Sequence, residues 1–178
     1  MESKVKMVKI KKMLILILCI LVCFLIQTSL LPYFSLAGIV PNVMLILVVS
    51  YAYIVGQKEG MLLGFFVGFL MDLFCGELIG PYALFYTYIG YFSGFFHFIY
   101  YTEIIILPLI LIVGLDFVFN MGIYVMFFLL RNRLDFGFYF SHIIVPEMIY
   151  TLAVGVFLYK LLHMVLGHTK PEISEGGM

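Results

Sequence analysis

The sequence predicts an all-α membrane protein, a bundle of six transmembrane helices, and two observations carry this prediction. First, 65% of the 178 residues are hydrophobic and only 11% are charged, which leaves too little polar surface to cover a water-soluble domain of this size. Second, long apolar stretches alternate with short polar breaks, and a helix needs about 20 apolar residues to cross a bilayer. A membrane barrel would instead show segments of about ten residues with alternating polarity.

The chain divides by composition into three parts. Residues 1–12 form a basic segment, residues 13–166 the six-helix transmembrane domain, and residues 167–178 a polar tail. The apolar run after residue 12 is too long for the core of a signal peptide, and the chain beyond it stays membrane-like, so we expect an uncleaved first helix.

Charge distribution predicts the orientation of the spans. Six spans place both termini on one side, which would then carry all eight lysines, whereas Arg131 and Arg133 would lie on the other side. Basic residues concentrate on the cytoplasmic side of membrane proteins, so we expect both termini in the cytoplasm. We also expect one of the two arginines to pair with an outer acidic residue.

The helices are expected over six ranges in chain order: 13–31, 42–55, 60–75, 82–99, 104–130 and 143–166. Residues 32–41 contain two prolines and should form a non-helical crossing. Residues 57–59 are polar and should form a tight turn that makes the second and third helices an antiparallel hairpin. Residues 131–142 should form the longest loop.

Small residues recur at every fourth position of the third helix. In water each glycine there would cost about 1 kcal/mol relative to alanine, whereas in lipid small residues let two helix backbones approach closely. A step of four residues advances a helix by about 400°, so only three or four consecutive members share one face. We therefore predict a seam at Gly60, Gly64 and Gly68, with Asp72 at its outer end. The seam serves packing inside the bundle or receives the helix of a partner. A second small pair, Gly90 and Gly94, lies in the fourth helix.

Acidic residues within the predicted spans need a stabilising contact, because a charge at the centre of a membrane helix costs at least about 2 to 3 kcal/mol. They are Asp72, Asp116 and Glu147. We consider three roles: a polar contact that fixes helix register, snorkelling to the outer interface, above all for Glu147, and proton or ion translocation. Asp116 and Asn120 lie one turn apart near mid-membrane, and we expect Asp116 to be protonated or hydrogen-bonded.

Signs of enzymatic chemistry are few. His142 and Glu147 form an HxxxxE pattern that faintly resembles a His/acid acyl-transfer pair, but no serine, cysteine or phosphate-binding motif accompanies it. Cys19 and Cys23 have no histidine or acid at ligand spacing and are interpreted as packing residues. We expect no catalytic residue, cofactor or metal, and the zero net charge gives no reason to expect a nucleic-acid partner.

The order of several features along the chain is typical of one family. A basic N-terminus is followed by Gln27 at the end of the first helix and by Pro41 and Asn42 at the start of the second. The stretch GFFVGFLMDLF, residues 64–74, comes next, and Gly80 follows it. This order resembles the rod shape-determining MreD family of bacteria over the whole chain in length and span count, and most specifically over residues 41–80.

The resemblance implies a non-enzymatic scaffold of the cell-elongation machinery in the bacterial cytoplasmic membrane, needed for rod shape and lateral peptidoglycan synthesis. It implies as partners the bitopic protein MreC, the actin-like MreB filament, and a peptidoglycan glycosyltransferase and transpeptidase pair.

The six-helix plan is also similar to that of the S components of energy-coupling-factor vitamin transporters, so a substrate-binding transporter subunit is the alternative. Such a subunit should line an outer polar cavity with Asn, Arg, Trp or Tyr. The sequence has no Trp, which favours the scaffold.

Overall fold

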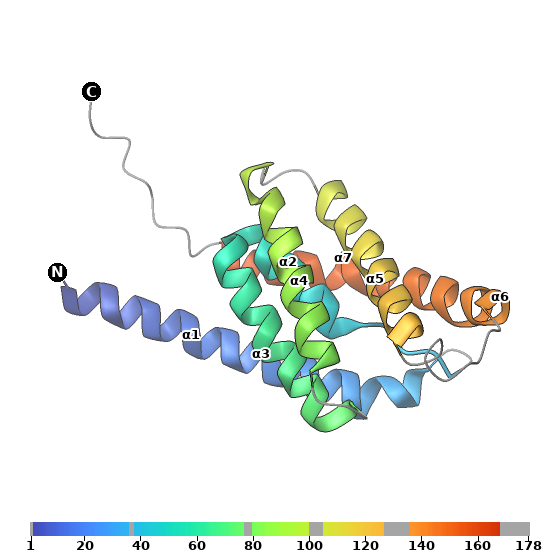
Figure 1. Ribbon diagram of the computed structural model, residues 1–178. Helices are drawn as coiled ribbons and strands as arrows, with labels where there is room; N and C mark the ends of the chain where they lie inside the picture. The colour runs from blue at the N-terminus through green and yellow to red at the C-terminus, as the bar shows by residue number, and fades with distance from the viewer. Residues whose placement is uncertain (1, 36–37, 77–79, 100–104, 127–135, 168–178) are drawn as a thin grey trace.

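The chain is almost entirely helical in the computed structural model, which describes residues 2–35, 38–76, 80–99, 105–126 and 136–167 (Figure 1). Its α-helices are α1 (Glu2–Leu25), α2 (Val43–Val55), α3 (Gln57–Cys75), α4 (Pro81–Phe95), α5 (Ile106–Tyr124), α6 (Phe136–Tyr139) and α7 (Val145–Gly167). Wider π-helical turns cover Ile26–Leu30 and Phe140–Ile144, and tighter 3₁₀ turns cover Leu31–Phe34 and Phe96–Ile99.

Three helical stretches of the described chain are long and apolar enough to cross a membrane: Met13–Phe34, Ile106–Tyr124 and Phe140–Met164. Very few residues of the first stretch are buried inside the protein, so its apolar side chains face outward, as expected for a helix solvated by lipid. The predicted all-α membrane bundle is confirmed.

Helix α2 forms the centre of the bundle. It contacts α3, α4, α5 and α7, and every side chain from Val43 to Ser50 is buried. A helix that is hydrophobic on all sides is stable only when it is surrounded. Its 13 residues extend about 20 Å at about 1.5 Å per residue, which is less than the membrane core of about 30 Å.

The outer helices pack around this centre. Figure 1 shows α3 and α4 side by side, α5 and α7 beyond α2, and the first turns of α1 projecting away from the bundle. Helices α3 and α4 are antiparallel, because Gly60, Gly64 and Gly68 lie against Gly90, Tyr86 and Tyr82 in that order.

The turn between α2 and α3 is shorter than predicted. Residues 57–59 form the first turn of α3 and not a separate polar turn. The chain reverses at Gly56 alone, whose φ of 125° lies in a region that side chains with a Cβ rarely adopt.

Two prolines explain two further differences from the prediction. Pro32 lies inside the 3₁₀ turn Leu31–Phe34, although a non-helical crossing was expected to begin there, and residues 136–142 are helical and not part of a loop. A proline removes one helical hydrogen bond and crowds the carbonyl four residues earlier. The carbonyls four residues before Pro32 and Pro146 are those of Thr28 and His142, and both fall in the π-helical turns. There the widened backbone accommodates the proline and the helix continues.

Several predicted features lie outside the described residues. These are Arg131 and Arg133 with their expected ion pair, and the polar tail from residue 168 onward. The basic segment begins α1, because the helix starts at Glu2.

Candidate functional site: the α3–α4 seam and an interior polar cluster

The glycine face of α3 lies directly against the backbone of α4. A Cβ added at Gly64 would overlap the carbonyl of Tyr86, and one added at Gly68 would overlap the backbone of Tyr82 and Ala83, at distances under 3.0 Å that real Cβ atoms essentially never show. Only hydrogen fits at these positions, so the two helices approach as closely as glycine allows.

Gly60 lies where three helices meet. A Cβ there would overlap Ala52 of α2 and the backbone of Gly90 on α4. Helix α4 contributes glycines of its own, since a Cβ at Gly90 would overlap Gly60 and a Cβ at Gly94 would lie 2.5 Å from Cα of Gln57. The seam is therefore built from both helices, and α4 occupies the glycine face of α3.

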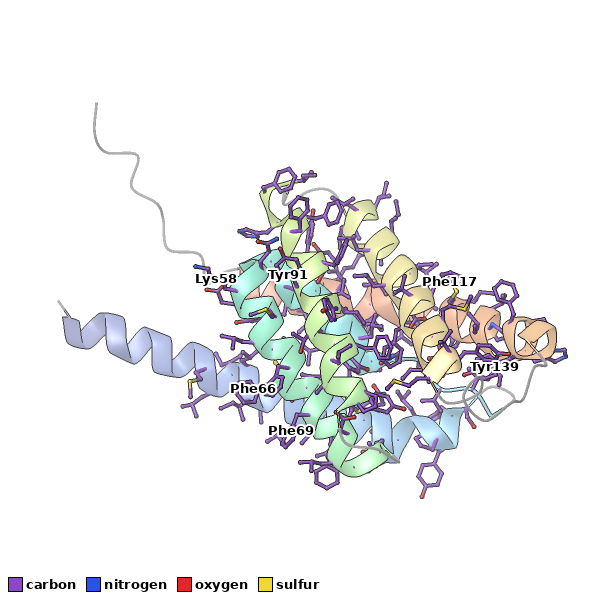
Figure 2. All side chains as sticks on the ribbon, in the orientation of Figure 1. Lys58, Phe66, Phe69, Tyr91, Phe117 and Tyr139 are labelled. Carbon is purple, nitrogen blue, oxygen red and sulfur yellow. The ribbon has the colours of Figure 1, made fainter. Side chains whose placement is uncertain are left out.

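The opposite face of α3 carries large apolar side chains. Phe66 and Phe69 are 62% and 41% exposed, and Figure 2 shows both pointing away from the bundle. Because the glycines face inward and the phenylalanines outward, α3 presents its flattest surface to α4 and its bulkiest surface to the membrane.

Asp72 caps the N-terminus of α4 from the neighbouring helix. The first amides of a helix have no acceptor within the helix. The carboxylate of Asp72 accepts the backbone N–H of Tyr82 at 3.0 Å and that of Ala83 at 2.9 Å, and it is 1% exposed. Pro81, the first residue of α4, has no N–H to satisfy. The negative charge also interacts favourably with the helix dipole.

Gly80 precedes this cap and has a φ of 124°. This conformation strains any residue with a Cβ, which gives a physical reason for glycine there. No side chain of the residue preceding α4 caps the helix, so the acceptor comes from α3.

Two side chains, those of Asn42 and Gln27, accept backbone N–H groups at the N-terminus of α2. Asn42 Oδ1 accepts the backbone N–H of Leu45 at 3.1 Å, and Gln27 Oε1 accepts that of Met44 at 2.8 Å. The carbonyl of Pro41 accepts from Val43 at 3.1 Å. Within a membrane no water is available for these amides. The hydrogen bond from Met44 to Gln27 therefore links the end of the first helical stretch to the central helix.

Asn42 also connects α2 to α4 and α7. The hydroxyl of Tyr86 donates to Asn42 Oδ1 at 2.8 Å, and the backbone N–H of Asn42 donates to Thr151 Oγ1 at 3.1 Å. Tyr86 and Thr151 are each 0% exposed. A single asparagine therefore links the helices on both sides of the central helix.

The acids of α5 and α7 extend this network. Asp116 is 0% exposed and Asn120 4%, and Asn120 Nδ2 donates to the backbone carbonyl of Asp116 at 3.1 Å. The Thr151 side chain and the half-buried Glu147 lie close enough to Asp116 to interact with it, and Glu147 is itself a neighbour of Asn120. We call these residues the interior polar cluster: Asn42, Tyr86, Asp116, Asn120, Glu147 and Thr151.

Two members of the cluster were not singled out from the sequence. Thr151 follows Glu147 by four residues, the same spacing as Asp116 and Asn120, and this shared helix face was a usable signal. Tyr86 had none, because it is one of 13 tyrosines in an apolar chain.

The other residues considered for catalysis or metal binding do not lie together. His142 is exposed and lies 2.9 Å from the Ser141 hydroxyl, whereas Glu147 belongs to the interior polar cluster. Within the part of the chain that the structure describes, no three His, Cys, Asp or Glu residues are grouped as metal ligands. Cys19 and Cys23 are both free, and each belongs to or packs against the hydrophobic core.

Comparison with known proteins assigns the family. The sequence matches the family model of the rod shape-determining protein MreD over residues 7–167, a range that includes both the seam and the cluster. No curated protein and no solved structure gives a significant match. The chain therefore belongs to the MreD family of rod shape-determining proteins.

Proposed function

We propose that this chain is a non-enzymatic scaffold of the cell-elongation machinery, needed for rod shape and for lateral peptidoglycan synthesis. The match to the MreD family over residues 7–167 carries the proposal. The polar residues of the described bundle support it, because Gln27, Asn42 and Asp72 each bind backbone amides at the start of a helix. Polar side chains used in this way hold helices in register, which is what a scaffold requires.

The proposed location is the bacterial cytoplasmic membrane, with both termini in the cytoplasm. Three apolar helical stretches support a location in the membrane. The orientation is supported by the positive-inside rule, because six spans would place eight lysines on the side of the termini and two arginines on the other side. In this orientation the basic N-terminus meets the anionic cytoplasmic leaflet.

The proposed partners are an MreC-like bitopic protein, an MreB-like actin filament on the cytoplasmic side, and the peptidoglycan glycosyltransferase and transpeptidase of the elongation complex. We assign Gly60, Gly64 and Gly68 to packing within the bundle and not to a partner's helix, because α4 fills the face they share.

Depletion of the protein in a rod-shaped host, followed by affinity capture from detergent-solubilised membranes, tests the proposal. Depleted cells should become round, and an MreC-like protein should co-purify with the tagged chain. A Gly114→Ala variant is a suitable control for rescue, because nothing lies within 4 Å of a Cβ at that position. Cells that keep their shape, lose uptake of a vitamin and yield an ATPase module on capture would favour the transporter subunit instead.

A further inference from the structure

The interior polar cluster contains more hydrogen-bond acceptors than donors. Three of its donors are directed elsewhere: the Tyr86 hydroxyl binds Asn42 Oδ1, the Asn42 backbone N–H binds Thr151 Oγ1, and the Asn120 amide binds the backbone carbonyl of Asp116. The Thr151 side chain lies close enough to Asp116 to interact with it, but its hydroxyl carries no charge. Among the described residues, no donor meets the geometry of a hydrogen bond to either carboxyl oxygen of Asp116. A buried acceptor without a donor is costly, and a buried charge without a partner costs far more.

Asp72 shows how this fold supplies donors to a buried carboxyl group. Both of its oxygens accept a backbone N–H, at 3.0 and 2.9 Å, beside the positive end of a helix. Asp116 is equally buried, at 0% exposed against 1% for Asp72, yet it lies in the middle of α5 with no such donors. The same chain therefore holds two buried aspartates in opposite environments.

Among the residues that the structure describes, the groups around Asp116 add no positive charge. The titratable neighbours are Glu147 from α7 and Tyr86 from α4, and α2 contributes the uncharged Asn42 through Thr151. A second carboxyl group makes a negative charge on Asp116 more costly still. A positive charge that balances Asp116 has to be small enough to enter a closely packed interior.

We propose that the interior polar cluster is a proton-binding site and that Asp116 holds the proton. A hydronium ion in water gives up one proton and becomes water, so one of its O–H bonds breaks as an O–H bond forms with one carboxyl oxygen of Asp116. This transfer removes the charge of Asp116 and turns that oxygen from an acceptor into a donor. The hydroxyl of the acid then donates to an acceptor within the cluster, Thr151 Oγ1 or the Glu147 carboxylate. The four helices α2, α4, α5 and α7 then meet around a network that carries one negative charge fewer.

Release of this proton leaves an uncompensated charge where α5 and α7 pack together and beside the cap of α2. Because the charge left behind has no hydrogen-bond donor among the described residues, we expect the bundle to be less stable without the proton than with it. The site couples proton binding to helix packing in a way that the proposed scaffold function does not require.

Infrared difference spectroscopy of the purified full-length protein in lipid nanodiscs tests the site directly. At neutral pH the wild type should show the carbonyl band of a protonated carboxylic acid, and this band should be absent from an Asp116→Asn variant and unchanged in Asp72→Asn. The band should disappear on alkaline titration. A wild-type protein without the band at neutral pH overturns the proposal.

Thermal unfolding across the same pH range gives an independent measurement. The melting temperature of the wild type should fall toward alkaline pH, whereas Asp116→Asn, a neutral group of nearly the same shape, should remove most of this dependence. Glu59→Gln, at an exposed position of α3, is the matched control and should retain it. An equal pH dependence in Asp116→Asn and the wild type contradicts the proposal.

Two other sources of positive charge are distinguished by the same experiments. An alkali-metal ion at the site would make the melting temperature rise with sodium or potassium but not with choline, and only when Asp116 is present. If an arginine from residues 127–135 supplied the positive charge, the double variant Arg131→Ala, Arg133→Ala would be destabilised as much as Asp116→Ala. Either result, without the carboxylic-acid band, replaces the proton and overturns the proposal.

Discussion

The carboxylate of Asp72 on α3 accepts a 2.9 Å hydrogen bond from the backbone amide of Ala83 on α4. The two residues belong to different helices, so one side chain both caps α4 and fixes its position along α3. The bond lies at one end of the glycine seam, where Gly68 touches the same Ala83. Close backbone packing and helix capping therefore depend on each other at this point.

Replacement of Asp72 by Asn is expected to destabilise the bundle. One oxygen of the amide can still accept a backbone N–H, but its NH₂ group faces the other donor, so one hydrogen bond to a charged acceptor is lost at a cost of about 1.5 to 3 kcal/mol. Circular dichroism during heating in detergent measures the change, since the chain has no Trp for fluorescence. Exposed Glu59→Gln should melt like the wild type, and equal melting of Asp72→Asn would rule out the capping role.

Alanine at Gly64 or Gly68 should force α3 and α4 apart. The added Cβ would overlap backbone atoms of α4, which cannot rotate away as a flexible side chain can, and overpacking of this kind costs about 1 to 3 kcal/mol. The yield of monodisperse protein from membranes and its melting temperature report the effect. The same change at Gly114, where nothing lies within 4 Å of the new atom, should leave both unchanged. Similar losses at Gly114 and Gly64 would show that glycine matters here for another reason.

Tyr86→Phe and Asn42→Ala should have non-additive effects. The Tyr86 hydroxyl bonds Asn42 Oδ1 at 2.8 Å, and such a bond contributes about 0.5 to 1.5 kcal/mol. Asn42→Ala also removes the cap of α2, which adds about 0.5 to 2 kcal/mol. In the Asn42→Ala background the further change Tyr86→Phe removes no hydrogen bond to residue 42, so a double-mutant cycle of unfolding free energies should show coupling. Fully additive effects would mean that this bond contributes nothing to stability.

Gln27→Leu should loosen the end of the first helical stretch from α2. The substitution leaves the backbone N–H of Met44, at a fully buried residue, without its acceptor, which costs about 1 to 3 kcal/mol. Hydrogen exchange in a peptide that contains Met44 should become faster. Thr28→Val is the control, because the Thr28 hydroxyl bonds only the carbonyl of Phe24 within its own helix at 2.8 Å. Unchanged exchange in Gln27→Leu would show that another group satisfies the amide.

Much of the fold follows from local features of the chain. Asn42 marks the start of α2 because its side chain can cap the helix that follows, and the structure begins α2 at Val43. The turn before α3 was predicted too long because Gln57, Lys58 and Glu59 are polar. Gly56 completes the reversal alone, so these three residues can open the helix.

The candidate site was predictable only in part. A spacing of four placed Gly60, Gly64 and Gly68 on one face, but it did not say whether α4, another helix or another protein would meet that face. Asp116 was recognisable as a buried polar residue, whereas its relation to Tyr86 depends on which helices surround α2.

By itself, the sequence determined the helical membrane character of this protein and the approximate extent of its helices, because each depends on side chains a few positions apart. Only the tertiary structure decided that Asp72 receives two backbone amides and Asp116 none. That difference depends on the rotation of each helix and on its neighbours, and contacts between residues far apart in the chain set both.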